Sequence, residues 1–131
     1  MAKLVNEGES RIANVLFAAQ TLDSVYYLGL YTNGSEPAET AGLADITELT
    51  GGAYGRKTLT RGSFSVTDSI ATYAQQAFTA NGGDWSGITG YFIGNSADNS
   101  GQLMWVESFS EGTFNINDGS TLNITPNIEV Y

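Results

Sequence analysis

Two apolar runs separated by a polar segment constrain the fold of this chain more than any other stretch. The runs Ile88–Ile93 and Leu103–Phe109 flank Gly94–Gly101, a segment rich in Gly, Asn, Asp and Ser. Short β-prone runs bounded by such residues predict a hairpin. Both tryptophans of the chain lie within or beside it, and burying large aromatic side chains is the largest hydrophobic gain available locally. The core residues expected from this hairpin are Trp85, Ile88, Phe92, Leu103, Trp105 and Phe109.

From Ser24 onward the apolar residues alternate with a period of two. Tyr26, Leu28 and Leu30 share one face of a predicted strand, because aromatic and branched side chains suit a pleated surface. Gly29 interrupts the opposite face, which predicts a bulge or a close approach by another strand. Further strands are expected within residues 53–61, 64–66, 70–80, 113–116 and 122–130.

Seven or eight short strands joined by Gly-rich turns are typical of a β-sandwich or a barrel. We favour an all-β, jelly-roll-like β-sandwich with one short N-terminal helix. The Asp-Gly step in Asn117–Ser120 predicts a tight turn. Pro126 has no amide hydrogen to give to a ladder, which places it at a strand start or on an edge.

Residues 7–20 carry the one helical period of the chain. The apolar positions spaced by three and four residues are Ile12, Val15, Leu16 and Ala19. A helix this short is marginal by itself and must pack on something, either its own domain or a neighbouring subunit. We assign residues 1–22 as an N-terminal arm or helix and residues 23–131 as a single β-sandwich domain.

A long acidic segment and a basic strand are the candidate contacts with partners. Residues 33–52 exceed the usual loop length, so they form either a partner-contacting loop or simply a long one, with a helical turn suggested by apolar residues three apart. Residues 53–61 hold three of the five basic residues, which predicts a catalytic or anion site, a strip that docks an acidic partner or a second copy or, as we favour, an ordinary solvent face paired with acids of the preceding loop. The candidate interface residues are Ile12, Val15, Leu16, Phe17, Leu43, Ile46, Arg56, Lys57 and Arg61.

The composition excludes many kinds of site. Cysteine and histidine are both absent, which removes disulfides, thiolate chemistry, His-assisted nucleophiles and His-ligated metals. A net charge of -9 disfavours nucleic acid as a partner. No apolar run reaches the ~20 residues of a membrane helix, and no secretory signal is visible near the first residues. We expect synthesis in the cytoplasm and neither a nucleic acid nor a membrane as partner.

Carboxylates are the remaining route to catalysis, and none stands in a convincing pair. Glu107 is the best candidate, since strand alternation places it on the side of Leu103 and Trp105, where burial would raise its pKa. The simpler explanation is that Glu107 lies at a strand end, where the sheet meets solvent or where the carboxylate pairs with an arginine. The segments Asp98–Ser100 and Asn115–Gly119 offer oxygen ligands for calcium but fit hairpin turns better. We expect no enzymatic activity, no metal and no cofactor.

Four motifs in order carry a resemblance to a known family. They are YYLGLYT at Tyr26–Thr32, AYGRKTLT at Ala53–Thr60, the GDW-to-WVESF stretch of the hairpin, and NINDGSTLNITPNIEV near the C-terminus. The series resembles small tailed-bacteriophage virion proteins of the tail-fibre or minor structural type. The chain departs from their pattern at Gly90–Phe92, where the family more often has His-Val-Gly-Leu.

The resemblance implies a virion component without enzymatic activity, made in the host cytoplasm. Two locations compete: a capsid decoration or cement protein bound to the major capsid protein as a trimer, and a tail- or fibre-associated protein. The small size and the single docking helix favour the cement protein. A carbohydrate-binding module is a third alternative, which would need exposed aromatics among Tyr27, Tyr31, Tyr54 and Tyr73.

Overall fold

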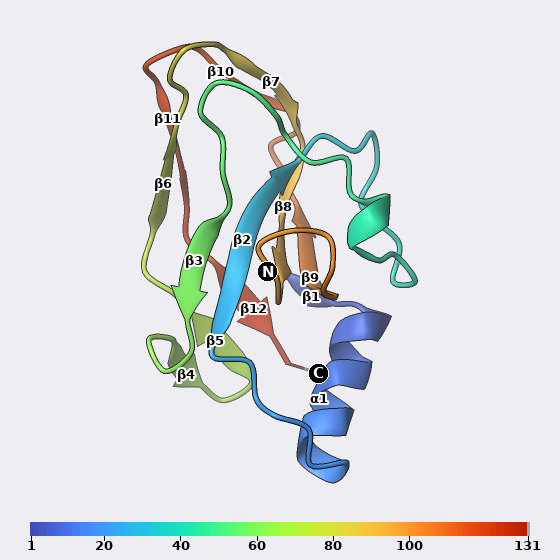
Figure 1. Ribbon diagram of the computed structural model, residues 1–131. Helices are drawn as coiled ribbons and strands as arrows, with labels where there is room; N and C mark the ends of the chain where they lie inside the picture. Colours follow the sequence, from blue (N-terminus) through green and yellow to red (C-terminus); the bar gives the residue numbers. More distant parts are fainter. Residues whose placement is uncertain (131) are drawn as a thin grey trace.

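A five-stranded antiparallel sheet forms the centre of the computed structural model, which describes residues 1–130 (Figure 1). In order across the sheet, its strands are β1 (Lys3–Leu4), β9 (Leu103–Ser108), β8 (Gly90–Gly94), β2 (Val25–Tyr31) and β3 (Lys57–Thr60). Apolar side chains alternate along β2, as its sequence predicts. Tyr26, Leu28 and Leu30 join one core cluster and Tyr31 joins another on the opposite face.

Three smaller ladders supply the second layer. The strands of these ladders are β12 (Asn127–Glu129), β5 (Ile70–Thr72) and β4 (Ser65–Thr67) in one, β11 (Thr121–Ile124) and β6 (Gln76–Thr79) in another, and β10 (Phe114–Ile116) and β7 (Trp85–Ile88) in the third. Their apolar residues, such as Phe78 and Trp85, share the main core cluster with Leu28 and Trp105 of the central sheet. The arrangement is sandwich-like and not a closed barrel, which confirms the predicted fold class. The jelly-roll connectivity stays a prediction.

Residues 1–130 form twelve short strands where the sequence predicts seven or eight, because three predicted strands are divided, the run 122–130 into β11 and β12 among them, and because the sequence does not predict β1. The run Ile88–Ile93 changes layer at Thr89, where β7 ends and the Thr89 amide donates to Tyr31 O in the central sheet at 2.9 Å. The run 70–80 likewise separates into β5 and β6. A continuous apolar run does not reveal that its two halves pair with different partners.

The predicted hairpin is present as β8 and β9, but its register shifts by one residue. Ile93 pairs with Trp105 and Gly94 pairs with Leu103, which leaves Met104 as an extra residue in β9. The bulge turns Leu103 into the second cluster while Met104 and Trp105 face the main one. The expectation that Leu103 and Trp105 share a face is therefore wrong, since a bulge interrupts strand alternation.

The second cluster lies on the other face of the central sheet, beneath the acidic segment 33–52. This segment contains one 3-10 turn, η1 (Leu43–Asp45), in the place where the spacing of three predicts a helical turn. Leu43 and Ile46 are 3% and 9% exposed and pack with Tyr31 and Phe92. The acidic segment therefore covers a sheet face that would otherwise be exposed.

The N-terminal residues are built into the sheet. Ala2 and Val5 are fully buried, and β1 pairs with β9. The helix α1 (Asn6–Phe17) packs on β9 at Gly8, where a Cβ would lie 2.5 Å from Met104 O. The domain boundary after residue 22 stays a prediction, and the last residue of the predicted domain, Tyr131, lies outside the described residues. No helix within residues 1–130 is long and apolar enough to cross a bilayer.

Gly29 marks a close approach, as its position in β2 predicts. A Cβ added there would overlap the ring of Phe92 and lie 2.9 Å from Tyr54 Oη. Both neighbours are held in the core, so Gly29→Ala should lower the free energy of unfolding by about 1–3 kcal/mol in urea denaturation. Gly55→Ala is the matched control, because no atom lies within 4 Å of its added Cβ. Equal stability of the two variants would contradict this packing.

Candidate functional site

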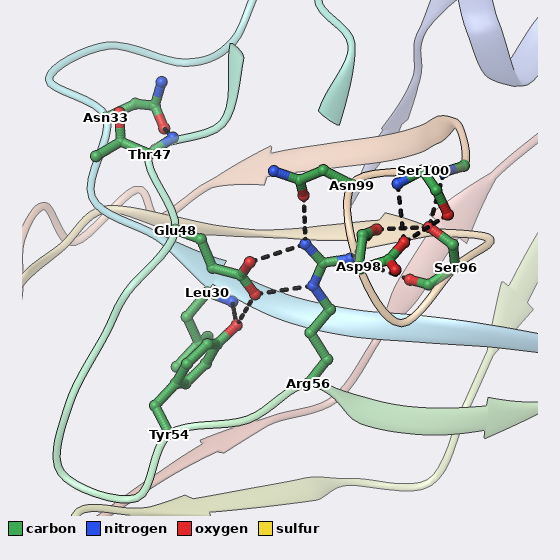
Figure 2. Close-up of polar contacts among 11 residues, drawn as sticks. Leu30, Asn33, Thr47, Glu48, Tyr54, Arg56, Ser96, Asp98, Asn99 and Ser100 are labelled. Atoms are coloured by element: carbon green, nitrogen blue, oxygen red, sulfur yellow. Dashed lines mark hydrogen bonds and ion pairs between the residues drawn. The ribbon is translucent and has the colours of Figure 1, made fainter. Parts of the chain in front are cut away.

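Arg56 is the centre of the most extensive polar network in the described chain (Figure 2). Its side chain is 7% exposed although it carries a full charge. Nε and Nη2 donate to the two carboxylate oxygens of Glu48 at 2.9 and 2.8 Å. Nη1 donates to the carbonyls of Ser96 and Asp98, and Nη2 also donates to the side chain of Asn99. All five N–H groups of the guanidinium thus have a partner.

Glu48 links this arginine to the central sheet. The hydroxyl of Tyr54 donates to Glu48 Oε2 at 2.6 Å and accepts from the Leu30 amide at 3.0 Å. The guanidinium carbon also lies 5.0 Å from the centre of the Phe92 ring, a cation–π distance. The network therefore ties the acidic segment, the β8–β9 turn and strand β2 together.

Ionisation in this network follows from burial and pairing. The hydrogen bond to Glu48 raises the pKa of Arg56 above its ordinary value, although burial opposes it. Burial, with the hydrogen bond to Glu48, raises the pKa of Tyr54 well above its ordinary value. The pairing of a basic residue of 53–61 with an acid of the preceding loop, which the sequence analysis favours, is confirmed at Arg56. Arg56 does not lie on a solvent face.

The other predicted interface residues lie in different environments. Leu43 and Ile46 are buried in the core of the chain and have little area to offer a partner. Lys57 is half-buried with its ammonium 5.5 Å from the Phe78 ring centre, and Arg61 is exposed just after β3. The helix residues Ile12 and Val15 are half-buried. The structure does not bring the nine residues together into one surface.

An exposed apolar surface surrounds the end of α1, and we call it the helix-end surface. It consists of Leu16, Phe17, Leu22 and Val130, with exposed fractions of 68%, 87%, 54% and 44%. The interface residues expected from the sequence include Leu16 and Phe17 but not Leu22 and Val130. Neither of these two residues lies in the helix, so only the folded chain brings them to its end. Large apolar side chains gathered in the open mark interaction sites.

Glu107 lies in a polar groove that other carboxylates share. The groove has a volume of about 530 Å³ and is also lined by Lys3, Glu36, Phe109 and Glu111. Glu107 accepts a hydrogen bond from the N-terminal ammonium of Met1 at 2.9 Å, and Lys3 pairs with Glu36 at 3.1 Å. Glu107 is therefore a glutamate near a strand end that pairs with a cation, which is the simpler of the two interpretations of its sequence position.

The remaining sequence candidates have structural roles. Asp98–Ser100 forms the β8–β9 turn, where Asp98 Oδ1 accepts from the Ser100 amide at 2.8 Å. Asn117–Ser120 is the predicted tight turn, closed by a 2.8 Å hydrogen bond from the Ser120 amide to Asn117 O. Tyr31 is fully buried and the Tyr54 hydroxyl is bonded inside the network, so the four tyrosines do not form an exposed row for a glycan. Within residues 1–130, no three carboxylates gather as a metal site.

Buried tyrosines give the fold an alkaline limit. Burial raises the pKa of Tyr31 to about 12, whereas an unfolded tyrosine loses its proton near pH 10. The unfolded state therefore binds fewer protons above pH 10, and stability falls as the pH rises from about 10 to 12. Tyr31→Phe should make this decline shallower by about 1.4 kcal/mol per pH unit in urea denaturation across that range, although it lowers stability at pH 7. An unchanged slope would contradict the shift.

Comparison with known proteins identifies the class of the chain. A protein-family model matches residues 3–128, which include every element described above except the last residue of β12. The match defines a bacteriophage virion structural protein of fibre type, as the motifs of the sequence predict. More specifically, the chain belongs to the family described as podophage GP4 fiber I protein gp80. No curated protein matches the chain.

Proposed function

We propose that this protein is a non-enzymatic structural subunit of a tailed-phage fibre. The observation that carries the proposal is the family match over residues 3–128, nearly the whole chain. The match covers the sheet, the acidic segment and α1 together, so it concerns the complete described fold rather than one motif. The subunit is made in the host cytoplasm and then assembles with other virion proteins.

The use of the polar side chains supports a structural role. The guanidinium of Arg56 donates its hydrogen bonds to Glu48 and to the carbonyls of the β8–β9 turn. Glu107 and Glu36 are each paired with a cation of the same chain. These groups link segments of the same chain, which supports a structural use.

The capsid decoration role favoured by the sequence is the alternative location. A cement protein and a fibre subunit both need a stable, exposed domain with a docking surface, and the fold serves either purpose. The family description favours the fibre. The trimer expected of a cement protein stays a prediction.

Labelling of intact particles tests the location. A short epitope inserted at Gly62, an exposed residue in the turn after β3, is recognised by gold-conjugated antibody and imaged on purified virions. We expect gold confined to fibres at the tail end of the particle. Gold spread over the head shell would overturn the fibre proposal in favour of capsid decoration.

A further inference from the structure

The chain contains two Asn-Gly steps, Asn33-Gly34 and Asn81-Gly82. Such a step favours a spontaneous reaction in which the glycine nitrogen attacks the side-chain carbon Cγ of the asparagine. Glycine permits the attack because it has no Cβ to block the approach and because its backbone reaches most conformations. The asparagine side chain must also rotate freely onto the following nitrogen. The surroundings of the two steps therefore decide which of them reacts in the folded protein.

The side chain of Asn33 is held at both ends of its amide. Its Nδ2 donates to Asp45 O at 3.0 Å, and its Oδ1 accepts from the Thr47 amide at 2.8 Å (Figure 2). These two bonds fix the acidic segment to the chain just after β2. Rotation of the side chain breaks both, and each lost bond lowers the population of the reactive form several-fold. Asn33 is therefore protected while the chain stays folded.

The side chain of Asn81 has no such restraint. Asn81 and Gly82 are both exposed in the connection between β6 and β7, and no hydrogen bond from residues 1–130 holds the Asn81 side chain. The backbone is anchored instead: the Asn81 amide donates to Gly52 O at 2.9 Å, and the Gly82 amide donates to Asp118 Oδ1 at 2.9 Å. A carboxylate at this distance can accept the proton that the attacking nitrogen loses.

We propose that Asn81-Gly82 is a site of spontaneous deamidation in the folded protein, with Asp118 as the base. The Gly82 nitrogen forms a bond to Asn81 Cγ, and its proton passes to Asp118 Oδ1. The bond between Cγ and Nδ2 then breaks, and the side-chain nitrogen takes up that proton and leaves as ammonia. Water opens the resulting succinimide ring at either carbonyl, which yields aspartate or isoaspartate. The proposal is independent of the fibre assignment, since it concerns the single chain.

The modification alters a connection that leads into the core. Isoaspartate adds one carbon to the backbone between β6 and β7, and β7 begins at the buried Trp85. Trp85 Nε1 donates to Gly51 O at 3.0 Å, and the neighbouring Gly52 O accepts from the Asn81 amide. The longer backbone therefore disturbs two adjacent contacts with one turn. Both products also add a carboxylate to a chain whose net charge is -9. We expect a lower thermal midpoint for the deamidated protein than for the fresh protein.

Peptide mass spectrometry after incubation at mildly alkaline pH tests the site. In the folded chain, deamidation at Asn81 should be at least tenfold faster than at Asn33, because the Asn33 side chain must first break two hydrogen bonds. In concentrated urea the two rates should converge, since unfolding removes both the protection and the base. Equal rates in the folded chain, or a faster reaction at Asn33, would overturn the proposal.

Three variants separate the contributions. Asp118→Asn keeps an oxygen that can accept from the Gly82 amide but cannot take up its proton, so the reaction at Asn81 should slow at least threefold. Fragment ions must assign the change to residue 81, because this variant creates a new Asn-Gly step before Gly119. Asp68→Asn is the matched control, since it removes an exposed carboxylate from the turn between β4 and β5 and should leave the rate unchanged.

Asn81→Gln should abolish both the reaction at this position and the fall in thermal midpoint, because the longer side chain closes the corresponding ring far more slowly. Circular dichroism checks that the variants fold. A rate at Asn81 that is unchanged or faster in Asp118→Asn would show that Asp118 restrains the Gly82 amide and would overturn its assignment as the base.

Discussion

Replacing Arg56 by alanine should lower the free energy of unfolding by about 3–5 kcal/mol, the usual result of removing one partner of a buried ion pair. The reason lies in what remains. Glu48 loses its cationic partner while its side chain is only 24% exposed, and the carbonyls of Ser96 and Asp98 lose their donors. Urea denaturation at pH 7 measures the loss. Arg61→Ala removes an exposed arginine and should change stability by no more than about 0.5 kcal/mol.

Two further variants separate charge from geometry. Arg56→Lys keeps the charge but offers a single ammonium in place of the planar fork that contacts two segments, so it should recover only part of the loss. A double-mutant cycle with Glu48→Gln isolates the energy of the pair. Hydrogen exchange should quicken first at the amides of the β8–β9 turn, because Arg56 anchors that turn. Equal stability of the Arg56→Ala and Arg61→Ala proteins would show that the network contributes nothing.

Replacing Trp105 by alanine should cost about 3–5 kcal/mol. The indole is 5% exposed, its N–H donates to Glu129 O at 3.1 Å, and its ring meets the ring of Tyr26 edge-on at 6.1 Å. The substitution therefore removes apolar area, a hydrogen bond from β9 to β12 and an aromatic contact together. Thermal and urea denaturation give the change in stability.

Phe17→Ala is the control for the tryptophan, because it removes an aromatic ring that is 87% exposed. It should change stability by about 0.5 kcal/mol or less. Trp105→Phe keeps most of the buried area and loses the N–H, so it should fall between the wild type and Trp105→Ala. If alanine at 105 were as harmless as alanine at 17, the ring would not be part of the core.

The sequence predicts those parts of the fold that depend on neighbours along the chain. The β8–β9 hairpin follows from two apolar runs around a polar turn, and the faces of β2 follow from its alternation. The change of layer at Thr89 depends on Tyr31, a partner distant in the sequence, and the bulge at Met104 interrupts the alternation inside the hairpin itself. A period of two cannot reveal them, since each strand looks regular by itself.

The candidate functional residues likewise include some features that local sequence predicts and others that only tertiary contacts decide. The apolar stripe of α1 predicts a packing face, but the buried residue of the helix is Gly8, which a hydrophobic pattern does not register. Leu16, which belongs to the predicted stripe, is exposed. A charge pattern predicts that Arg56 is a surface residue, yet three of its five N–H donors bond to residues some forty positions away in the β8–β9 turn and the other two bond to Glu48. Its burial is a tertiary property.

The pairing of β1 with β9 also determines when the protein can complete its fold during synthesis. Lys3 pairs with Val106, so about a hundred residues must leave the ribosome before β1 finds its partner. Until then Val5 and the rest of the second cluster lack part of their cover. The nascent chain therefore exposes apolar surface for most of its synthesis, and truncated products that end before β9 should be aggregation-prone and should need chaperones or degradation.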